Sequence, residues 1–428
     1  MIFLEEQPKE KKGDKHVKKG SKKTKDTKPQ KVVVEKVEYL EHMNVDKATE
    51  VAIYYGFTPS TLPIIGKEDK EAVKEFRKHD GLQKEDDFPV TTAEERSAIF
   101  RMYEDKSMIA LPQPVMLSFN GFVNEGKNRK SIEKKIALEI LGSTKSISEA
   151  MAIRSSMAIL EEYGYDNLSV EINSVGDKES VNRFTKEITS YGRKNINNLS
   201  AVCRQSFKLD PYSIIHCDCG ICSSLTENAP KTMSCLSEVS REHFKEVLEF
   251  LEKMEIPYKI NHCLTGERHV SSQTVFEIKH QTTTGKIETL VKGYRYDGLS
   301  KKLGFKKEIP CLSVKMHFKN NIKDKDLVKK IRKARLYFIQ LGFEAKHKAI
   351  GLIETLRRQH ILVHQSLSRD KIGSQLILAE RMKIPFVIIM GQKEAIDDTV
   401  MIRNIKSRSQ NTIAIQNLTE HIKLQEWF

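Results

Sequence analysis

Short apolar segments alternate with helical patterns through the last quarter of the chain. Apolar segments stand at residues 336–339 and 385–390, and apolar residues recur at helical spacing through 345–358 and 371–382. An alternation of this kind is typical of a mixed or parallel sheet covered by helices. We therefore expect residues 330–428 to form an α/β domain.

The preceding part of the chain shows strand and helix patterns with a different order. Residues 169–176 and 274–279 are predicted to be buried strands. The pattern at 147–163 predicts a helix with one apolar face, and Ser240 is expected to be the N-cap of a later helix. Together these elements predict an α+β fold before residue 330.

The charge of the chain favours a polyanionic partner. The 428 residues carry a formal net charge of +14, and residues 1–36 contain twelve lysines against six acidic residues. Residues 1–31 are predicted to be a disordered basic tail that either adds unspecific affinity for RNA or is merely solvated. No apolar run is long enough for a membrane span, and residues 1–4 are too few for a signal peptide. We therefore expect a cytoplasmic protein that binds nucleic acid and no membrane.

Seven cysteines, an odd number without a secretory signal, argue against a disulfide framework. Cys217, Cys219 and Cys222 follow one another closely, with Cys203 and Cys235 nearby, so their thiolates could bind zinc. The usual zinc-site spacing, with two C-x2-C pairs in succession, is absent. Free thiols in a small, weakly packed module are therefore the alternative.

Five segments resemble the histidyl-tRNA synthetase family and follow the order found there. They are YYGFTPSTLPII at 54–65, SVEINSVG at 169–176, TVFEI at 274–278, RYDGL at 295–299, and LILAERMKIPFVIIMG with DDTVMIRNIKSRSQNTIAI at 376–415. The first resembles the first conserved motif of class II aminoacyl-tRNA synthetases, and the last resembles the C-terminal anticodon-binding domain. The resemblance extends from about residue 34 to residue 422.

This resemblance implies an α+β fold of the class II synthetase type. An antiparallel sheet with helices is expected, followed by a C-terminal α/β anticodon-binding-like domain. A homodimer formed through residues 54–65 is implied as well. The expected parts are a basic disordered tail at 1–31, a synthetase-like core at 32–176 and 241–325, an insertion module at 177–240, and the anticodon-binding-like domain at 330–428.

The family places three arginines around the reacting phosphate of ATP, and the resemblance finds none of them here. Gly266 stands at the place of the arginine in the histidine-binding loop, Asn124 near that of the second motif and Asn320 at that of the third. Lys315 and His317 stand where small residues of the third motif admit the nucleotide. Because adenylate formation needs fixed cations, we expect weak or absent catalysis and name no catalytic residue.

Some elements of the family's substrate pocket persist. Glu94 matches a glutamate that holds the amino group of histidine, and Glu125 keeps the acid of the second motif. Tyr296 and Asp297 keep the RYDGL turn. These four residues are candidate relics of the pocket, although Asp-Gly is ordinary turn chemistry and Glu94 could simply be exposed.

The C-terminal segment offers candidate RNA-binding residues. Arg403, Lys406, Arg408 and Gln410 lie in the part that resembles the family's anticodon-contacting strand and loop. Basic and amide side chains suit contacts to phosphates and to the bases of single-stranded loops. A solvated charged surface is the alternative.

The predicted function is that of a histidyl-tRNA synthetase-like protein that binds tRNA or another structured RNA and is impaired or inactive in aminoacylation. One alternative is a divergent but active histidine--tRNA ligase, which would use ATP with magnesium, histidine and tRNA. Another is a regulatory or scaffold dimer, such as a polymerase accessory subunit or an allosteric partner of a histidine-biosynthetic enzyme. No cofactor is expected for the predicted function, zinc stays open, and no protein partner is predicted.

Overall fold

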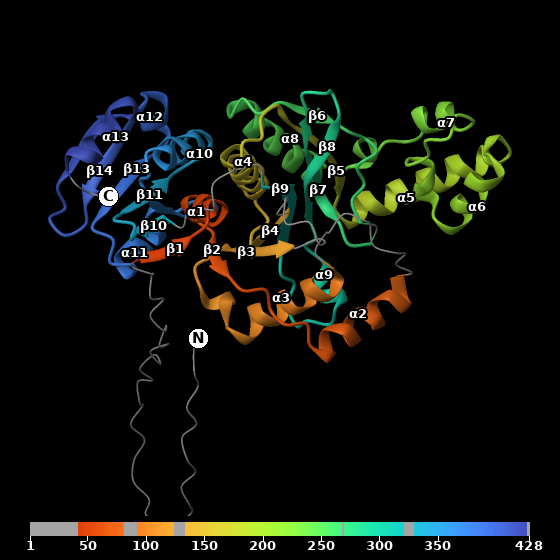
Figure 1. The fold of residues 1–428 in the computed structure, drawn as a ribbon, viewed down its shortest axis with the longest axis horizontal. Coiled ribbons are helices and arrows are strands. Elements are labelled where there is room, and N and C mark those ends of the chain that lie inside the picture. The colour runs from red at the N-terminus through yellow and green to blue at the C-terminus, as the bar shows by residue number, and fades with distance from the viewer. Residues whose placement is uncertain (1–41, 81–91, 124–132, 268, 321–328, 426–428) are drawn as a thin grey trace, which may run out of the picture. The chain divides into compact units, whose positions relative to one another are not determined.

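Figure 1 shows a computed structural model of the chain, which describes residues 42–80, 92–123, 133–267, 269–320 and 329–425. The predicted tail at residues 1–31 lies outside this part. Within the described residues, no helix is both long enough and apolar enough to cross a membrane.

An eight-stranded sheet forms the centre of the chain. Its order is β2-β3-β4-β9-β8-β7-β5-β6, where only the edge strands β2 and β6 run parallel to their neighbours. The strands are β2 (Thr58–Ser60), β3 (Val115–Val123), β4 (Glu133–Leu141), β5 (Leu168–Gly176), β6 (Tyr258–Ile260), β7 (Ser272–Gln281), β8 (Ile287–Arg295) and β9 (Cys311–Lys319). The predicted antiparallel sheet is confirmed.

Helices cover both faces of this sheet. They are α1 (Lys47–Tyr54), α2 (Lys67–Asp80), α3 (Ala93–Asp105), α4 (Ile147–Glu162), α8 (Glu238–Lys253) and the short α9 (Leu299–Lys302). Successive side chains of a strand point to opposite faces, so Leu312 and Val314 of β9 pack in the core with α4 and α8. On the other face, Phe76 of α2 and Phe100 of α3 form a second apolar cluster with Leu117 of β3.

Two helix predictions are corrected. Helix α4 is buried over thirteen of its sixteen residues instead of along one face, because it packs against α1 and α8 as well as the sheet. Helix α8 begins one turn before the predicted position. Ser237 is its N-cap and accepts a hydrogen bond from the backbone N–H of Ser240 at 3.2 Å.

The insertion between β5 and α8 has its own small core. It contains α5 (Lys178–Lys194), α6 (Ala201–Leu209) and α7 (Ser223–Glu227), joined by short 3-10 turns. Phe184 and Ile188 of α5 pack against Phe207 of α6 and Tyr212. This apolar cluster is separate from the two that flank the central sheet.

A five-stranded mixed sheet forms the C-terminal part, as predicted. Its order is β12-β11-β13-β14-β15, with the first two pairs parallel and the last two antiparallel. The elements are β11 (Leu336–Gln340), α10 (Phe343–Arg358), β12 (Val363–Gln365), α11 (Ile372–Arg381), β13 (Phe386–Met390), α12 (Gln392–Ile396), β14 (Thr399–Asn404), β15 (Gln410–Ala414) and α13 (Ile415–Leu424). Two further strands, β1 (His42–Val45) and β10 (Lys329–Arg332), pair with each other.

Buried polar contacts join α10 to the helices of the central body. The carboxylate of Glu354 accepts a hydrogen bond from the hydroxyl of Tyr55 at 2.6 Å and lies 3.2 Å from the guanidinium of Arg154 in α4. Arg357, one turn along α10, donates to Glu162 at 2.8 Å. Burial alone would raise the pKa of Glu354, but its hydrogen bonds and the neighbouring arginines lower it to about 2.

Candidate functional site

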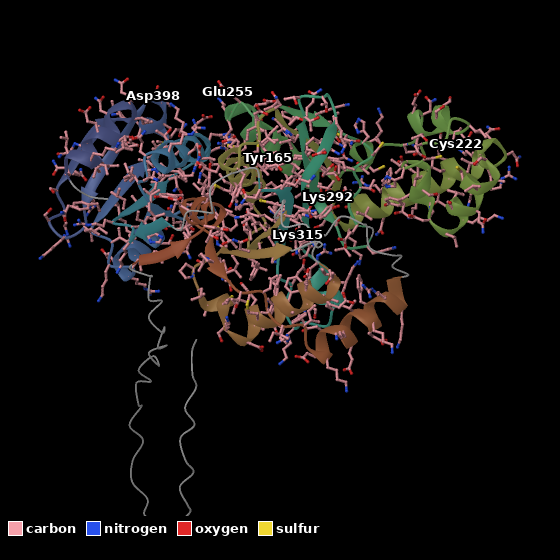
Figure 2. All side chains as sticks on the ribbon, in the orientation of Figure 1. Tyr165, Cys222, Glu255, Lys292, Lys315 and Asp398 are labelled. Carbon is pink, nitrogen blue, oxygen red and sulfur yellow. The ribbon has the colours of Figure 1, made fainter. Side chains whose placement is uncertain are left out.

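Polar side chains occupy the face of the central strands that points away from α4 and α8. Lys315 of β9 is the register partner of Lys292 of β8, which in turn lies opposite Glu277 of β7 (Figure 2). The ammonium of Lys292 lies 3.5 Å from the carboxylate of Glu277. Lys315 lies 3.4 Å from Glu95. Lys292 and Lys315 are therefore paired with carboxylates of the same chain.

His317, which the family resemblance places at the nucleotide, lies on the same face. Its Nε2 is 2.9 Å from the carboxylate of Glu133 on β4. Lys315 and His317 are thus engaged with acidic residues, and their bulk stands where the resemblance expects small side chains.

A buried carboxyl group and a buried guanidinium lie beside Tyr296. Glu139 of β4 accepts hydrogen bonds from the hydroxyls of Tyr296 at 2.8 Å and Ser313 at 2.6 Å. Burial raises the pKa of Glu139, although those hydrogen bonds act in the opposite direction. The guanidinium of Arg96 lies 4.9 Å from the centre of the Tyr296 ring and binds both oxygens of Glu267, at 2.7 and 2.6 Å. The chain's own ion pair therefore fills the space beside Tyr296.

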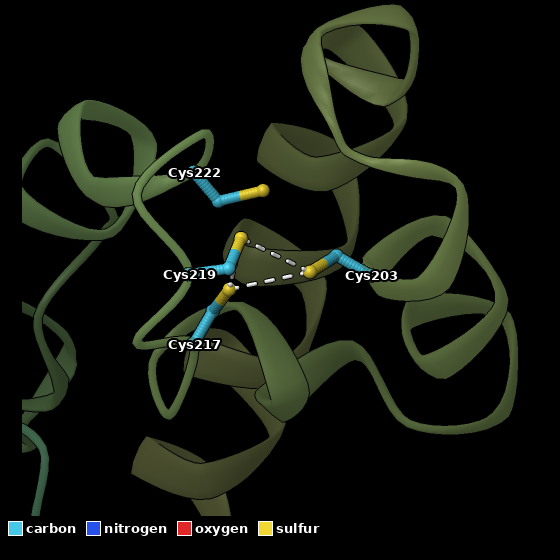
Figure 3. A group of neighbouring side chains, drawn as sticks. All are labelled: Cys203, Cys217, Cys219 and Cys222. Carbon is cyan, nitrogen blue, oxygen red and sulfur yellow. Dashed lines mark hydrogen bonds between the residues drawn. The ribbon is translucent and has the colours of Figure 1, made fainter.

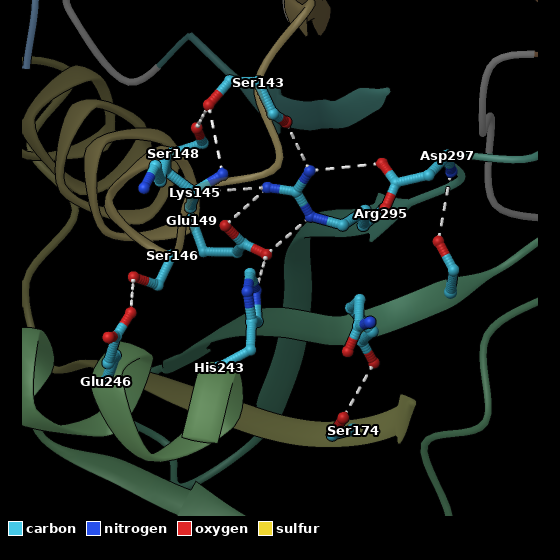
Figure 4. A network of polar contacts seen from close by, with 12 residues as sticks. Ser143, Lys145, Ser146, Ser148, Glu149, Ser174, His243, Glu246, Arg295 and Asp297 are labelled. Atoms are coloured by element: carbon cyan, nitrogen blue, oxygen red, sulfur yellow. Dashed lines mark hydrogen bonds and ion pairs between the residues drawn. The ribbon is translucent and has the colours of Figure 1, made fainter. Parts of the chain in front are cut away.

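The RYDGL turn is held by a second buried network, in which the carboxylate of Glu149 lies between Arg295 and His243 (Figure 4). Two nitrogens of Arg295 donate to Glu149, each at 2.8 Å, and a third donates to Asp297 at 3.2 Å. Burial alone would raise the pKa of Glu149, but the charges of Arg295 and His243 outweigh it and lower the pKa to about 2. The network fixes the start of the turn to α4 and α8.

Three of the four predicted pocket residues lie in the described part of the chain, and each has a different partner. Tyr296 and Asp297 are adjacent, with Tyr296 bound to Glu139 and Asp297 to Arg295. Burial raises the pKa of Asp297, against the opposing effect of Arg295. Glu94 instead lies at the start of α3, with its carboxylate 3.0 Å from Arg77 of α2. Glu125 lies outside the described residues, so its prediction stays open.

Of the three positions at which the family has an arginine, the structure describes two, Gly266 and Asn320. Gly266 has a φ of +61°, and a Cβ added there would approach the hydroxyl of Ser271 to 2.4 Å and a methyl of Val275 to 2.8 Å. This loop conformation therefore has no room for a side chain at position 266. Asn320 directly follows β9 and is half-buried, whereas Asn124 lies outside the described residues.

One hairpin carries all four candidate RNA-binding residues. Arg403 of β14 is the register partner of Gln410 of β15, and Lys406 and Arg408 lie in the exposed turn between the strands. The side chain of Asn404 accepts the backbone N–H of Lys406 at 2.9 Å, and its carbonyl accepts that of Arg408 at the same distance. The turn is thus preformed, and it presents cationic and amide groups side by side.

The predicted zinc ligands also converge. The thiols of Cys217, Cys219 and Cys222 lie within 4.8 Å of one another, and the thiol of Cys203 from α6 joins them (Figure 3). Cys235 is not part of this group. Sequence spacing indicated three members and left the fourth open, because thirteen residues separate Cys203 from Cys217.

Comparisons with known proteins find one family model and curated relatives that match most of the chain. The model of the family described as "Anticodon binding domain" matches residues 335–425. The chain is 28% identical over 382 residues to the "Histidine--tRNA ligase" of Fervidobacterium nodosum, which covers 85% of this chain and 90% of the relative. It is 24% identical over 406 residues to the "Histidine--tRNA ligase" of Desulforamulus reducens, covering 91% of this chain and 96% of the relative. Apo histidyl-tRNA synthetase of S. aureus, a solved structure, has 22% identity and a TM-score of 0.48, over 88% of this chain and 93% of that one.

An antiparallel sheet flanked by helices and followed by an anticodon-binding domain defines a class II aminoacyl-tRNA synthetase type of protein. Within that class, the curated relatives match nearly the whole chain. The family model and the curated relatives therefore support a histidyl-tRNA synthetase-like member of the class II aminoacyl-tRNA synthetase family.

Proposed function

We propose that this chain binds tRNA, or a similarly structured RNA, as a histidyl-tRNA synthetase-like protein that is impaired or inactive in aminoacylation. The observation that carries the proposal is that cations on the polar face of the central sheet are paired with carboxylates of the same chain. Lys292 and Lys315 are paired with carboxylates, and Arg96 is committed to Glu267. The loop at Gly266 excludes a side chain, so the arginine expected there has no equivalent at that position.

These features bear directly on adenylate formation. A histidine carboxylate that attacks the α-phosphate of ATP shifts negative charge onto phosphate oxygens, and that charge needs cations fixed in advance. Removing one such group typically costs about a hundredfold or more in rate. Cations already neutralised by Glu277 and Glu95 serve this purpose poorly, because each phosphate would first have to displace a carboxylate.

Histidine-dependent exchange of pyrophosphate into ATP tests the catalytic half of the proposal. We expect a rate at least about a hundredfold below that of the Fervidobacterium nodosum relative, assayed in parallel as the positive control. A comparable rate would overturn it and favour the alternative of a divergent, active histidine--tRNA ligase. That alternative is supported by the names of relatives that match most of the chain.

RNA binding belongs, in this proposal, to the predicted anticodon-binding-like domain at residues 330–428. The hairpin with Arg403, Lys406, Arg408 and Gln410 would contact an RNA loop, because cations and amides suit phosphates and base edges. Fluorescence anisotropy with a histidine-accepting tRNA and a non-cognate tRNA, at equal salt concentration, measures this directly. Equal affinity for both would contradict recognition of an anticodon loop.

We further propose a homodimer formed around residues 54–65. Strand β2 (Thr58–Ser60) is an edge strand of the central sheet, and Leu62 and Ile64 after it are 41% and 89% exposed. An isologous contact would bury the same apolar patch on both copies. Light scattering at micromolar concentration should give the mass of two chains. A monomer would contradict this contact, and would also remove the support for the regulatory or scaffold dimer.

A further inference from the structure

Four cysteine thiols converge in the insertion from two segments that are distant in the sequence. Cys203 lies in the first turn of α6, and Cys217, Cys219 and Cys222 lie in the loop before α7. The sulfur of Cys203 is 3.3 Å from that of Cys217 and 3.5 Å from that of Cys219, and the latter two are 3.3 Å apart. All four sulfurs lie within 4.8 Å of one another (Figure 3).

These distances fit a single tetrahedral metal ion. Zinc binds cysteine sulfur at about 2.3 Å, so the sulfurs of a tetrahedral site are about 3.8 Å apart. The three separations given above are within about half an ångström of that value. Thiolates that hold an iron–sulfur cluster attach to different iron atoms and stand farther apart, so the geometry favours a mononuclear site.

A disulfide bond and simple packing in an apolar core both account for the cysteine cluster less well than a metal ion does. All four cysteines are free, and sulfurs 3.3 Å apart are well beyond the bond length of about 2 Å in a disulfide. Thiols that only fill a core are surrounded by apolar side chains and fully buried, as Cys235 is. Cys203, Cys217 and Cys219 are instead half-buried and directed at one another.

The loop backbone is fixed independently of any ligand. The backbone N–H of Cys222 donates to the carbonyl of Cys219 at 3.0 Å, which closes the C-x2-C turn. The hydroxyl of Thr226 lies 3.3 Å from the carbonyl of Cys217 and 3.2 Å from that of Cys222. His216, next to Cys217, has its Nε2 3.1 Å from the hydroxyl of Thr265, so it faces a different partner. The loop therefore presents three sulfurs together without a histidine.

We propose that Cys203, Cys217, Cys219 and Cys222 bind one zinc ion that cross-links α6 to the loop before α7. Four sulfur ligands in a tetrahedron select zinc among the common divalent ions. The thiols lose their protons to solvent when the metal binds. Four protein ligands leave no open coordination position, so the ion has a structural role and takes no part in the chemistry of the central sheet.

The module gives a physical reason for such a cross-link. Its apolar cluster is small and separate from the cores of the sheet, and small modules commonly rely on a metal or on disulfides for stability. The ion would tie the first turn of α6 to the loop before α7. This inference is independent of the proposed RNA-binding function.

Metal analysis of the full-length protein tests the proposal. The protein is purified with reductant and without a metal-affinity tag, and zinc is measured by plasma mass spectrometry. We expect about one zinc ion per chain. After removal of zinc, addition of cobalt(II) should give the intense visible absorption of a tetrahedral thiolate site.

Serine variants locate the site. Cys203→Ser and Cys219→Ser should each lose the metal, whereas Cys235→Ser and Cys263→Ser should keep it. Cys235 is a matched control because it is buried in the same module and lies outside the group. The cobalt titration of the unaltered chain does not depend on whether a variant folds. Wild-type protein without zinc and without the cobalt absorption would overturn the proposal, as would a metal content that none of the four substitutions changes.

Discussion

Gly266 is a residue whose backbone sets its identity. Its φ of +61° belongs to the left-handed region, and a Cβ would lie 2.4 Å from the hydroxyl of Ser271. Gly285 also has a positive φ, of +81°, but nothing lies within 4 Å of an added Cβ. The pair therefore separates backbone strain from steric conflict.

Gly266→Ala should lower the free energy of unfolding by more than Gly285→Ala does. Strain alone costs on the order of 1 kcal/mol, and the steric conflict with Ser271 adds to it at position 266 only. Urea unfolding followed by circular dichroism measures both variants. Equal losses of stability would mean that the loop moves to accept the methyl group, and the argument for an excluded arginine would fail.

Glu149 should make stability depend on pH. Its pKa is lowered to about 2 in the folded chain, from an ordinary value of 4.5. A lowered pKa means that the stabilisation is present above about pH 4.5 and is lost as the pH falls towards 2. Glu149→Gln should therefore destabilise the protein by about 3–5 kcal/mol at pH 7, since it leaves Arg295 buried without its carboxylate.

The difference between this variant and the wild type should shrink as the pH falls from 4.5 to 2, because the wild-type carboxylate is then protonated too. Urea midpoints at several pH values give the comparison. Glu242→Gln, an exposed change on α8 next to His243, is the control and should shift stability by less than about 0.5 kcal/mol. A pH-independent difference would show that Glu149 acts through packing alone.

For helices and strands, the local sequence predicted which segments form them, whereas tertiary contacts determined where α8 begins. The apolar segments at 336–339 and 385–390 gave correct strands, because both strands are buried in the sheet. The N-cap of α8 was misplaced because two serines stand three residues apart. Asp177 settles the choice: it accepts the hydroxyl of Ser237 at 2.7 Å, and its backbone N–H donates to Ser240 at 3.0 Å. No local pattern contains that contact.

The candidate sites also include residues that are close in the sequence and residues that only the tertiary fold brings together. The residues of the β14–β15 hairpin are neighbours in the sequence, so their grouping was predictable. Arg96 and Glu267 are 171 residues apart, and their ion pair depends on the packing of α3 against the central sheet. Arg96 directly follows Glu94 and Glu95, so the local sequence alone favours a surface position for it.

The β14–β15 hairpin should act as a unit in RNA binding. Replacing Arg403, Lys406 and Gln410 together by alanine should weaken tRNA binding, since it removes both phosphate and base contacts. A matched control is the triple alanine variant of Arg381, Gln392 and Lys393, which removes the same residue types from exposed positions on α11 and α12. Anisotropy titrations at fixed salt compare the two. An equal decrease in affinity would indicate general charge attraction instead of a defined interface.

For the whole molecule, the basic tail should contribute affinity without specificity. Lysines that neutralise phosphates release counterions, so binding weakens as salt rises. Deleting residues 1–31 should make the plot of log affinity against log salt less steep, by roughly 0.7–0.9 for each phosphate that the tail would otherwise neutralise. The preference for histidine-accepting tRNA should survive the deletion. Disappearance of that preference would place specificity in the tail.

The contacts of Glu354 bear on whether the two halves of the chain could ever be used apart. This carboxylate, in the C-terminal part, is bound by Arg357 and Arg358 of its own helix and also contacts Tyr55 and Arg154 of the preceding part. A fragment that began near residue 330 would keep Arg357 and Arg358 beside this carboxylate but lose Tyr55 and Arg154. It would also expose the apolar side of α10 that now lies in the shared core. A fusion protein that contained only this C-terminal part would therefore need new polar or apolar partners on the exposed side of α10. Substitutions on one side of this interface therefore require compensating substitutions on the other side.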